Sequence, residues 1–251
     1  MALSRYQFER AFHDSAAAVG RARAVRFYAA GALDEADALY WQRVIASCHG
    51  TVLELGCGPG SSLRALRPDS CRLILSDISF QMCRRAREVA GKDPAGGRVS
   101  VVQTAAEALP FAGGSVDLVI GHSVLHHLDL CAAEREMLRV LAPGGRAVFL
   151  EPLGHNPLLW LYRRLTREER TRDERPLRMQ DVEALAAKFS AARHTEFGFT
   201  TLGLVVLRVL LRRPRLWPRL LNLLSAADRT LAELLPFIRE FYWVTVIELE
   251  R

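Results

Sequence analysis

The chain has 251 residues, of which half are apolar and a quarter are charged, the composition of a soluble globular protein with a sizeable core. The formal net charge is +6, and all but two of the 34 basic side chains are arginine. The longest apolar stretch, residues 202–211, is interrupted by an arginine and is too short to span a bilayer, which argues against a transmembrane protein.

The cysteines and the first residues indicate a compartment. Five cysteines lie scattered with no CxxC pair, at positions 48, 57, 71, 83 and 131. This spacing argues against a zinc site and a disulfide framework, so we predict no metal and a reducing cytoplasm. Residues 1–15 carry charges where a secretory signal needs an apolar run, which also favours a cytoplasmic protein.

In chain order, residues 1–50 have a mixed helical pattern with several aromatic side chains, and the residues after them have a different pattern of apolar residues. Short apolar runs then alternate with helical patterns, which predicts βαβ units and a parallel sheet. The predicted strands are 52–55, 72–76, 99–103, 116–120 and 147–150, and the predicted helices are 61–67, 80–90 and 132–141. Pro143-Gly144-Gly145 is predicted to end the last of these helices and turn the chain into the fifth strand.

The remainder is rich in helix formers up to residue 236, with residues 195–200 as a candidate strand. Residues 241–249 (Phe-Tyr-Trp-Val-Thr-Val-Ile-Glu-Leu) have an alternating pattern of side chains, which predicts a final strand. Arginines between positions 163 and 178 are interleaved with acidic residues, which is typical of a solvated, ion-paired helix face, although arginine also binds anionic substrates. Residues 208–224 are basic and leucine-rich, and could contact a membrane, cover a lipophilic substrate or pack as a cap helix.

A glycine-rich turn follows the first predicted strand. Gly56, Gly58 and Gly60 occupy alternate positions, and Glu54 precedes them by two residues. Glycines permit a tight turn and a close approach of backbone N–H groups to a ligand. A carboxylate beside a pyrophosphate would be unfavourable, whereas one beside the ammonium of an amino-acid ligand would be favourable. Asp77 ends the second predicted strand, where an acid can accept both ribose hydroxyls or, alternatively, cap helix 80–90.

These features resemble a known family. Residues 54–60 (Glu-Leu-Gly-Cys-Gly-Pro-Gly) resemble motif I of class I S-adenosylmethionine (SAM)-dependent methyltransferases, in the type 11 group that includes ubiquinone/menaquinone-biosynthesis methyltransferases. Further segments resemble the same group in the same order, at 106–111, 115–120, 124–128 and 141–145. The resemblance implies SAM as cofactor and a Rossmann-like α/β sheet of seven strands, in the order 3-2-1-4-5-7-6, with only the last strand antiparallel.

The resemblance also implies roles for single residues. The methionine part of SAM would lie against Gly56, Gly58, Gly60 and Glu54; the ribose and adenine would meet Asp77 and Ile78; Ala106 and Glu107 would flank the adenine edge; and His122 would lie near the sulfonium. One position departs from the pattern, because Ala105 stands where the family often has an aspartate that binds the adenine amino group.

Candidate catalytic residues follow the fifth predicted strand, because strand ends carry the chemistry of open α/β sheets. Glu151 and His155 are expected to face the methyl group, with His155 as general base or substrate-orienting group. His155 could instead cap a helix or face solvent. His127 is a third candidate, although with His126 it could simply pack in the fold, and methyl transfer can also proceed by positioning alone.

The expected organisation is an N-terminal helical lid or substrate-capping segment at 1–50, a SAM-binding core at 51–152, and a region at 153–251 that completes the sheet with helical substrate-binding insertions. The expected reaction is methylation of O or N of a small, lipophilic or secondary-metabolite acceptor, with C-methylation of a quinone precursor as a variant. The basic charge leaves a nucleic-acid methyltransferase as an alternative, although that charge is spread out. A non-catalytic regulatory partner with the same fold is a third.

Overall fold

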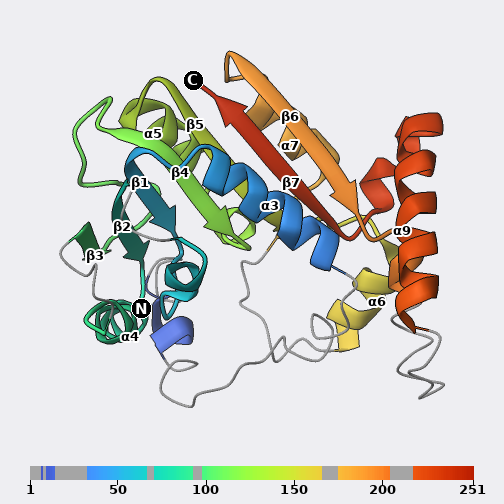
Figure 1. Cartoon of the computed structure of the whole chain (residues 1–251), viewed down its shortest axis with the longest axis horizontal. Helices are drawn as coiled ribbons and strands as arrows, with labels where there is room; N and C mark the ends of the chain where they lie inside the picture. The colour runs from blue at the N-terminus through green and yellow to red at the C-terminus, as the bar shows by residue number, and fades with distance from the viewer. Residues whose placement is uncertain are drawn as a thin grey trace.

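Seven strands form one sheet in the computed structural model, which describes residues 7, 10–14, 33–66, 71–92, 98–165, 175–203 and 217–251. The strand order is β3-β2-β1-β4-β5-β7-β6, as the family resemblance implies (Figure 1). Strands β1 to β5 run parallel, and β7 is antiparallel to both β5 and β6. The strands are β1 (Gly50–Leu55), β2 (Cys71–Asp77), β3 (Val99–Gln103), β4 (Val116–His122), β5 (Leu141–Pro152), β6 (Ala191–Phe197) and β7 (Val244–Glu250).

The central strands are buried on both faces, which explains their nearly continuous apolar sequences. Leu53, Leu55 and Ile120 are completely buried in β1 and β4. One face of the sheet packs against apolar residues of helix α3 (Asp34–Ala46), and the other packs against helices α5 (Leu130–Val140) and α7 (Met179–Ala186).

The remaining helical elements are α4 (Phe80–Ala90), α6 (Pro157–Leu165), α9 (Trp217–Leu234) and the 3₁₀ turns η1 (Ser61–Arg64), η3 (Leu125–His127) and η5 (Pro236–Phe241). Among the described residues, no helix is both long and apolar enough to cross a membrane. In place of the helix expected over 61–67, the structure has only the short 3₁₀ turn η1 at Ser61–Arg64. The strand expected at 195–200 begins earlier, as β6 at Ala191–Phe197.

Helix α3 lies across β5 and β7 on the face of the sheet (Figure 1). Residues 1–50 are expected to form a helical lid; Asp37 of α3 meets His122 at the carboxyl end of β4, while most of α3 packs on the face of the sheet. Its buried residues Ala36, Tyr40 and Val44 join the core cluster beneath that face. The short described segment 10–14 lies on the carboxyl-end side of the sheet, next to the start of α4.

The glycines before the fifth strand form a bulge rather than a free turn. Helix α5 ends at Val140 and β5 starts at the next residue, so residues 143–145 already belong to the strand. The pairing of β4 with β5 shifts register between Val116 and Leu118. Gly144, with a φ of 74°, donates its N–H to the carbonyl of Arg251. The bulge lets the strand resume regular pairing at Arg146.

Candidate functional site

The glycine turn lies directly after β1 and needs its glycines. Gly56 and Gly58 have φ angles of 64° and 52°, a region that residues with a side chain rarely adopt. A Cβ on Gly56 would lie 2.7 Å from Cγ2 of Val124, so this glycine lets the turn approach the chain after β4. A Cβ on Gly58 would meet nothing within 4 Å, because the position faces open space. The turn therefore leaves open space for a ligand at Gly58.

Asp77 links this turn to the end of β2. Its carboxylate accepts the N–H of Gly58 at 2.9 Å and the N–H of Ser79 at 2.8 Å. Burial raises the pKa of Asp77 above its usual value, and the two N–H donors oppose that rise. The capping role that the sequence leaves open for Asp77 belongs instead to Ser79, whose hydroxyl accepts the N–H of Met82 at the start of α4.

A hollow opens beside Gly58 and Asp77, where the strand order reverses between β1 and β4. In open α/β sheets this crevice is the usual ligand site. Its volume is about 830 Å³ including space open to solvent. We call it the cofactor hollow, and it is lined by His13, Gly56, Gly58, Ser76, Asp77, Ile78, Met82, Thr104, Ala105, Ala106, Glu107, Ser123, Val124, His127 and Leu128.

The structure brings most of the predicted cofactor residues together in this hollow. The residues that line it are Gly56, Gly58, Asp77, Ile78, Ala106 and Glu107. Gly60 supports the turn from behind, since a Cβ there would lie 3.3 Å from Leu63 and 3.4 Å from the backbone of Ala86. Glu54 and His122 also lie outside the lining.

Glu54 is buried beneath the turn, at 6% exposure. The hydroxyl of Ser62 donates a hydrogen bond to its carboxylate. Burial raises the pKa of Glu54 to about 7, and the hydrogen bond from Ser62 limits the rise. A cationic group arriving near this carboxyl would stabilise its charged form.

His122, expected near the sulfonium, points toward α3. Its Nε2 lies 3.2 Å from Oδ1 of Asp37, and its ring meets the ring of Tyr40 edge-on at 5.7 Å between centroids. The side chain therefore joins the end of β4 to α3.

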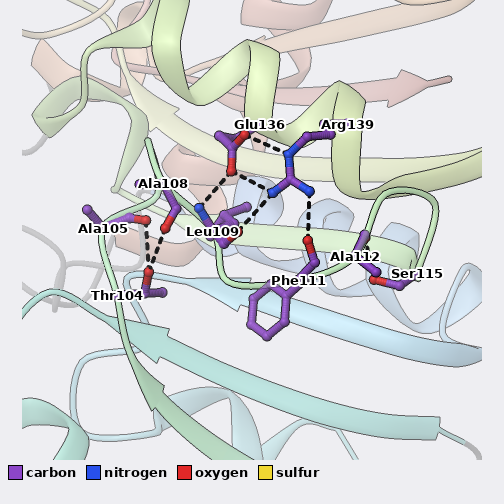
Figure 2. Close-up of polar contacts among 9 residues, drawn as sticks. All are labelled: Thr104, Ala105, Ala108, Leu109, Phe111, Ala112, Ser115, Glu136 and Arg139. Atoms are coloured by element: carbon purple, nitrogen blue, oxygen red, sulfur yellow. Dashed lines mark hydrogen bonds and ion pairs between the residues drawn. The ribbon is translucent and has the colours of Figure 1, made fainter.

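The loop that supplies Thr104 to Glu107 is held by helix α5 (Figure 2). Arg139 donates to the carbonyls of Phe111 at 2.7 Å and Leu109 at 2.8 Å, while Glu136 accepts the N–H of Leu109 at 2.7 Å. Arg139 and Glu136 also pair with each other at 2.7 Å. The hydrogen bond from Arg139 holds the pKa of Glu136 below its usual value. We call this group the loop clamp.

Segment 10–14 contributes His13 to the lining of the hollow, a residue that is not predicted from the sequence. Asp14 accepts the hydroxyl of Ser79 at 2.5 Å and the N–H of Gln81 at 3.0 Å, at the start of α4. This contact places His13 in the hollow, with its ring 5.6 Å from that of His127 and nearly perpendicular to it. No local sequence signal marks His13, because the contact joins segments far apart in the chain.

Glu151 lies behind the hollow and is completely buried. Its carboxylate accepts the N–H groups of Val124 and Leu125 at 2.7 and 2.8 Å and meets Nδ1 of His126 at 2.7 Å. These partners occupy the carboxylate, so the side chain holds η3 and does not face an incoming methyl group. His127, the next residue along η3, lines the hollow.

The structure places His155 elsewhere. Its Nδ1 lies 2.9 Å from Oε2 of Glu240, and it lines a different hollow together with Trp160 and Arg178. Of the three candidate catalytic residues, His127 alone lines the cofactor hollow.

The reversal of strand order, the glycine turn and the acid at the end of β2 define a Rossmann-like nucleotide-binding domain of the class I methyltransferase type. A family model described as a methyltransferase domain matches residues 53–149. Residues 53–149 are therefore similar to a methyltransferase domain, and the class I methyltransferases that share this fold use SAM as their cofactor.

The sequence is also similar to curated proteins over the same part. The ubiquinone/menaquinone biosynthesis C-methyltransferase of Enterobacter sp. (strain 638) is 36% identical over 120 residues, which cover 44% of this chain and 48% of that protein. The corresponding protein of Klebsiella pneumoniae subsp. pneumoniae is 37% identical over the same shares. The matched region spans about half the length of these relatives.

Solved structures share the fold at low identity. Geranyl diphosphate C-methyltransferase from Streptomyces coelicolor matches with a TM-score of 0.62 and 15% identity, over 87% of this chain and 80% of that one. Phosphoethanolamine N-methyltransferase 2 from Haemonchus contortus matches with a TM-score of 0.58 and 16% identity, over 84% and 52% of the two chains. These structures contain S-adenosylhomocysteine and SAM, respectively.

Proposed function

We propose that this protein is a SAM-dependent methyltransferase that acts on a small molecule. The observation that carries the proposal is the cofactor hollow, where Gly58 leaves open space beside the buried carboxylate of Asp77. When bound, SAM supplies an activated methyl group on its sulfonium. The chain's own residues bind and orient the two reactants, which is the main requirement for this transfer.

The residues of the hollow suggest how the cofactor would be held. Asp77 would accept the ribose hydroxyls, and Ile78 with Ala106 would pack on the adenine. Gly56 and Gly58 would approach the methionine part through their backbone, with Glu107 at the adenine edge. Gly60 would act by shaping the turn. Glu54 would act as an electrostatic partner of the methionine ammonium from beneath the turn, where burial raises its pKa.

The positions of the candidate catalytic residues lead us to assign them roles that differ from those expected from the sequence. His127 would be the residue closest to the reacting groups, because it lines the cofactor hollow. Glu151 would be a positioning residue that fixes η3 through its three hydrogen-bonding partners. His155 would meet the acceptor at a distance from the sulfonium, in the neighbouring hollow. His122 would position the end of β4.

The acceptor would be a small molecule that carries an apolar part. The named relatives and neighbours include enzymes for C- and N-methylation, so N and C acceptors belong to the proposal, and O is kept as the third acceptor expected from the sequence. Residues 1–50 and 153–251 would supply the acceptor side, and His13 of the first segment already lines the hollow. The described part of residues 208–224 exposes Leu220 and Leu223, which agrees with a lipophilic acceptor or membrane contact. We place the protein in the cytoplasm because its five cysteines are free.

The proposal is tested by binding and by turnover. Titration calorimetry should detect SAM binding, and Asp77→Ala should weaken it by about 1–3 kcal/mol because the ribose hydroxyls lose their acceptor. Gly58→Val should abolish binding, since its side chain would fill the open space. Labelled SAM should then transfer its methyl group to a member of a metabolite panel and not to tRNA. Unchanged SAM affinity in Asp77→Ala, or transfer to tRNA alone, would contradict the proposal.

A further inference from the structure

A second hollow lies between the end of β5, helix α6 and the start of α7. Its volume is about 1210 Å³ including space open to solvent, and its wall contains Arg163, Arg175 and Arg178. We call it the cationic hollow. The cofactor site does not use these arginines, and they come from two segments that are separated in the sequence.

Backbone pairing holds the second of these segments in place. Leu153 and Leu177 form a parallel bridge, Gly154 donates its N–H to the carbonyl of Leu177 at 2.9 Å, and Leu177 donates to the carbonyl of Pro152 at 3.2 Å. Arg175 also donates its N–H to the carbonyl of His126 at 3.0 Å. The backbone that carries Arg175 and Arg178 is thus attached both to β5 and to η3, so their positions do not depend on their own side chains.

The acidic groups of the cationic hollow are already engaged. Asp181, which lines the hollow, accepts the backbone N–H of Arg178 at 2.8 Å, and Glu240, which lies outside the lining, meets His155 at 2.9 Å. Within the described part of the chain, no carboxylate forms an ion pair with the side chain of Arg175 or Arg178. Two guanidinium groups that face one hollow favour an anion, and their planar forks match phosphate oxygens in particular.

An apolar surface borders the cationic hollow. Helix α6 exposes Leu158, Trp160 and Leu161 at 45%, 56% and 49%, and Trp160 also lines the hollow. The guanidinium of Arg164 lies over the ring of Trp160 at 5.3 Å. The surface therefore offers contacts for a hydrocarbon group next to a site for a negative group.

The cationic hollow is near the cofactor hollow. A third hollow shares Leu128 with the cofactor hollow, and shares Arg175 and Asp181 with the cationic hollow. The three hollows thus follow one another around the loop that contains η3.

We propose that the cationic hollow binds the phosphate or diphosphate group of an amphipathic organic phosphate, with Arg175 and Arg178 as its main ligands and α6 as the surface for the apolar part. We also assign this organic phosphate as the methyl acceptor of the enzyme. This assignment rests on the proposed function. His155 then contacts the anionic end of the acceptor rather than the reacting atom.

The first test uses inorganic pyrophosphate, titrated into the full chain with S-adenosylhomocysteine present. The double variant Arg175→Ala/Arg178→Ala should bind pyrophosphate at least tenfold more weakly than the original chain. The control Arg84→Ala/Arg146→Ala removes two surface guanidinium groups, which pair with Glu88 and Glu250, and should leave the affinity unchanged. Both variants should bind S-adenosylhomocysteine normally, which shows that they are folded. Equal weakening in the two variants, or none in the first, would overturn the proposal.

A second test separates the two sources of such a group. Decyl phosphate represents a soluble organic phosphate, and vesicles of phosphatidylglycerol represent a lipid headgroup. We expect decyl phosphate to bind more tightly than pyrophosphate, and this gain to be lost in Arg175→Ala/Arg178→Ala. Vesicle binding that is lost in the same variant, without binding of decyl phosphate, would overturn the assignment to a soluble acceptor.

The acceptor role has its own readout. Once an acceptor is found by turnover, Arg175→Ala/Arg178→Ala should raise its KM at least tenfold while kcat changes little. An unchanged KM in this variant would reject the acceptor role and leave the methyltransferase function standing. Tight pyrophosphate binding without turnover on any acceptor would retain the anion site and reject the proposed function.

Discussion

The Glu54 carboxyl lies in the core, where its charge is poorly solvated, and burial raises its pKa from 4.5 to about 7. The folded protein therefore holds a proton that the unfolded chain loses at lower pH, so Glu54 lowers the free energy of unfolding as the pH rises from 4.5 through 7. Glu54→Gln removes this effect. We expect the variant to be more stable than the original chain at pH 8, by on the order of 2 kcal/mol, and equally stable at pH 4.

Urea denaturation at the two pH values measures this difference. Glu88→Gln changes an exposed carboxyl on α4 and should show no such pH dependence. The same Glu54→Gln variant should bind SAM about tenfold more weakly at pH 8, because the methionine ammonium loses its charged partner. A variant that gains no stability at pH 8 would show that Glu54 is well solvated.

The two histidines that the sequence offers as catalytic groups lie in different hollows, and this separation predicts different kinetic effects. His127→Ala should lower kcat by about 10²-fold or more, because His127 lines the cofactor hollow, where a proton could be accepted. His155→Ala should chiefly raise KM for an acceptor with an anionic group, because His155 lines the cationic hollow. Steady-state kinetics with saturating SAM separates the two parameters.

Both variants should keep SAM affinity within a few-fold, as measured by calorimetry. The reverse pattern, with a large loss of kcat in His155→Ala alone, would show that the acceptor reaches the methyl group through the cationic hollow.

At the scale of elements, the loop clamp predicts that helix α5 affects SAM affinity, because it holds a loop that lines the cofactor hollow. Arg139→Ala removes the donors to the carbonyls of Leu109 and Phe111. The loss of these hydrogen bonds should loosen the loop that carries Thr104 to Glu107 (Figure 2). We expect SAM affinity to fall about three- to tenfold and the free energy of unfolding to fall by about 1 kcal/mol. Arg135→Ala, which removes an exposed arginine of the same helix, serves as the matched control.

The clamp also has a pH signature with a definite sign. The pKa of Glu136 is lower in the folded protein, so its stabilisation is complete above pH 4.5 and is lost as the pH falls through the lowered value. The difference in thermal stability between the original chain and Arg139→Ala should therefore narrow in acid, to the part that the hydrogen bonds to the carbonyls of Leu109 and Phe111 contribute. A constant difference between them at all pH values would contradict the role of the ion pair.

The elements themselves were predictable where local sequence determines them. Strands β1 to β4 are apolar runs bounded by turn residues, and the prediction of helix 80–90 matches α4 because Ser79 caps it. Strand β6 was predicted too late, since it lies at the sheet edge and its first residues are exposed, so the sequence lacks an apolar alternation there. The order of all seven strands follows from the family resemblance, because local patterns do not specify long-range pairing.

The site shows the same division. Gly56, Gly58 and Asp77 were predictable because a turn after a strand has a characteristic sequence. The environments of Glu151, His155 and His13 were not, since each depends on a contact with a distant segment: Glu151 with η3, His155 with Glu240, and His13 with His127. Location after a strand predicted that Glu151 would be close to the site, and only packing decides which way its carboxylate points.

At the scale of the whole molecule, one carboxylate joins α9 to the edge of the sheet. Asp228 is buried, and its oxygens accept the N–H groups of Phe199 at 3.0 Å and Thr200 at 2.7 Å, just after β6. The hydroxyl of Tyr242 donates to the carbonyl of Asp228, next to β7. The described part of the C-terminal region is thereby attached to the sheet that carries the cofactor hollow.

Asp228→Ala would leave these buried N–H groups without an acceptor, so we expect the free energy of unfolding to fall by about 2–4 kcal/mol. Glu233→Ala changes an exposed carboxylate of the same helix and should shift it by less than about 0.5 kcal/mol. Urea denaturation measures both, and calorimetry below the unfolding transition should give unchanged SAM affinity in both variants, because the cofactor hollow draws no lining residue from α9. If Asp228→Ala instead weakened SAM binding while the protein remained folded, α9 would take part in shaping the cofactor hollow, and the separation between the cofactor site and the C-terminal region would be wrong.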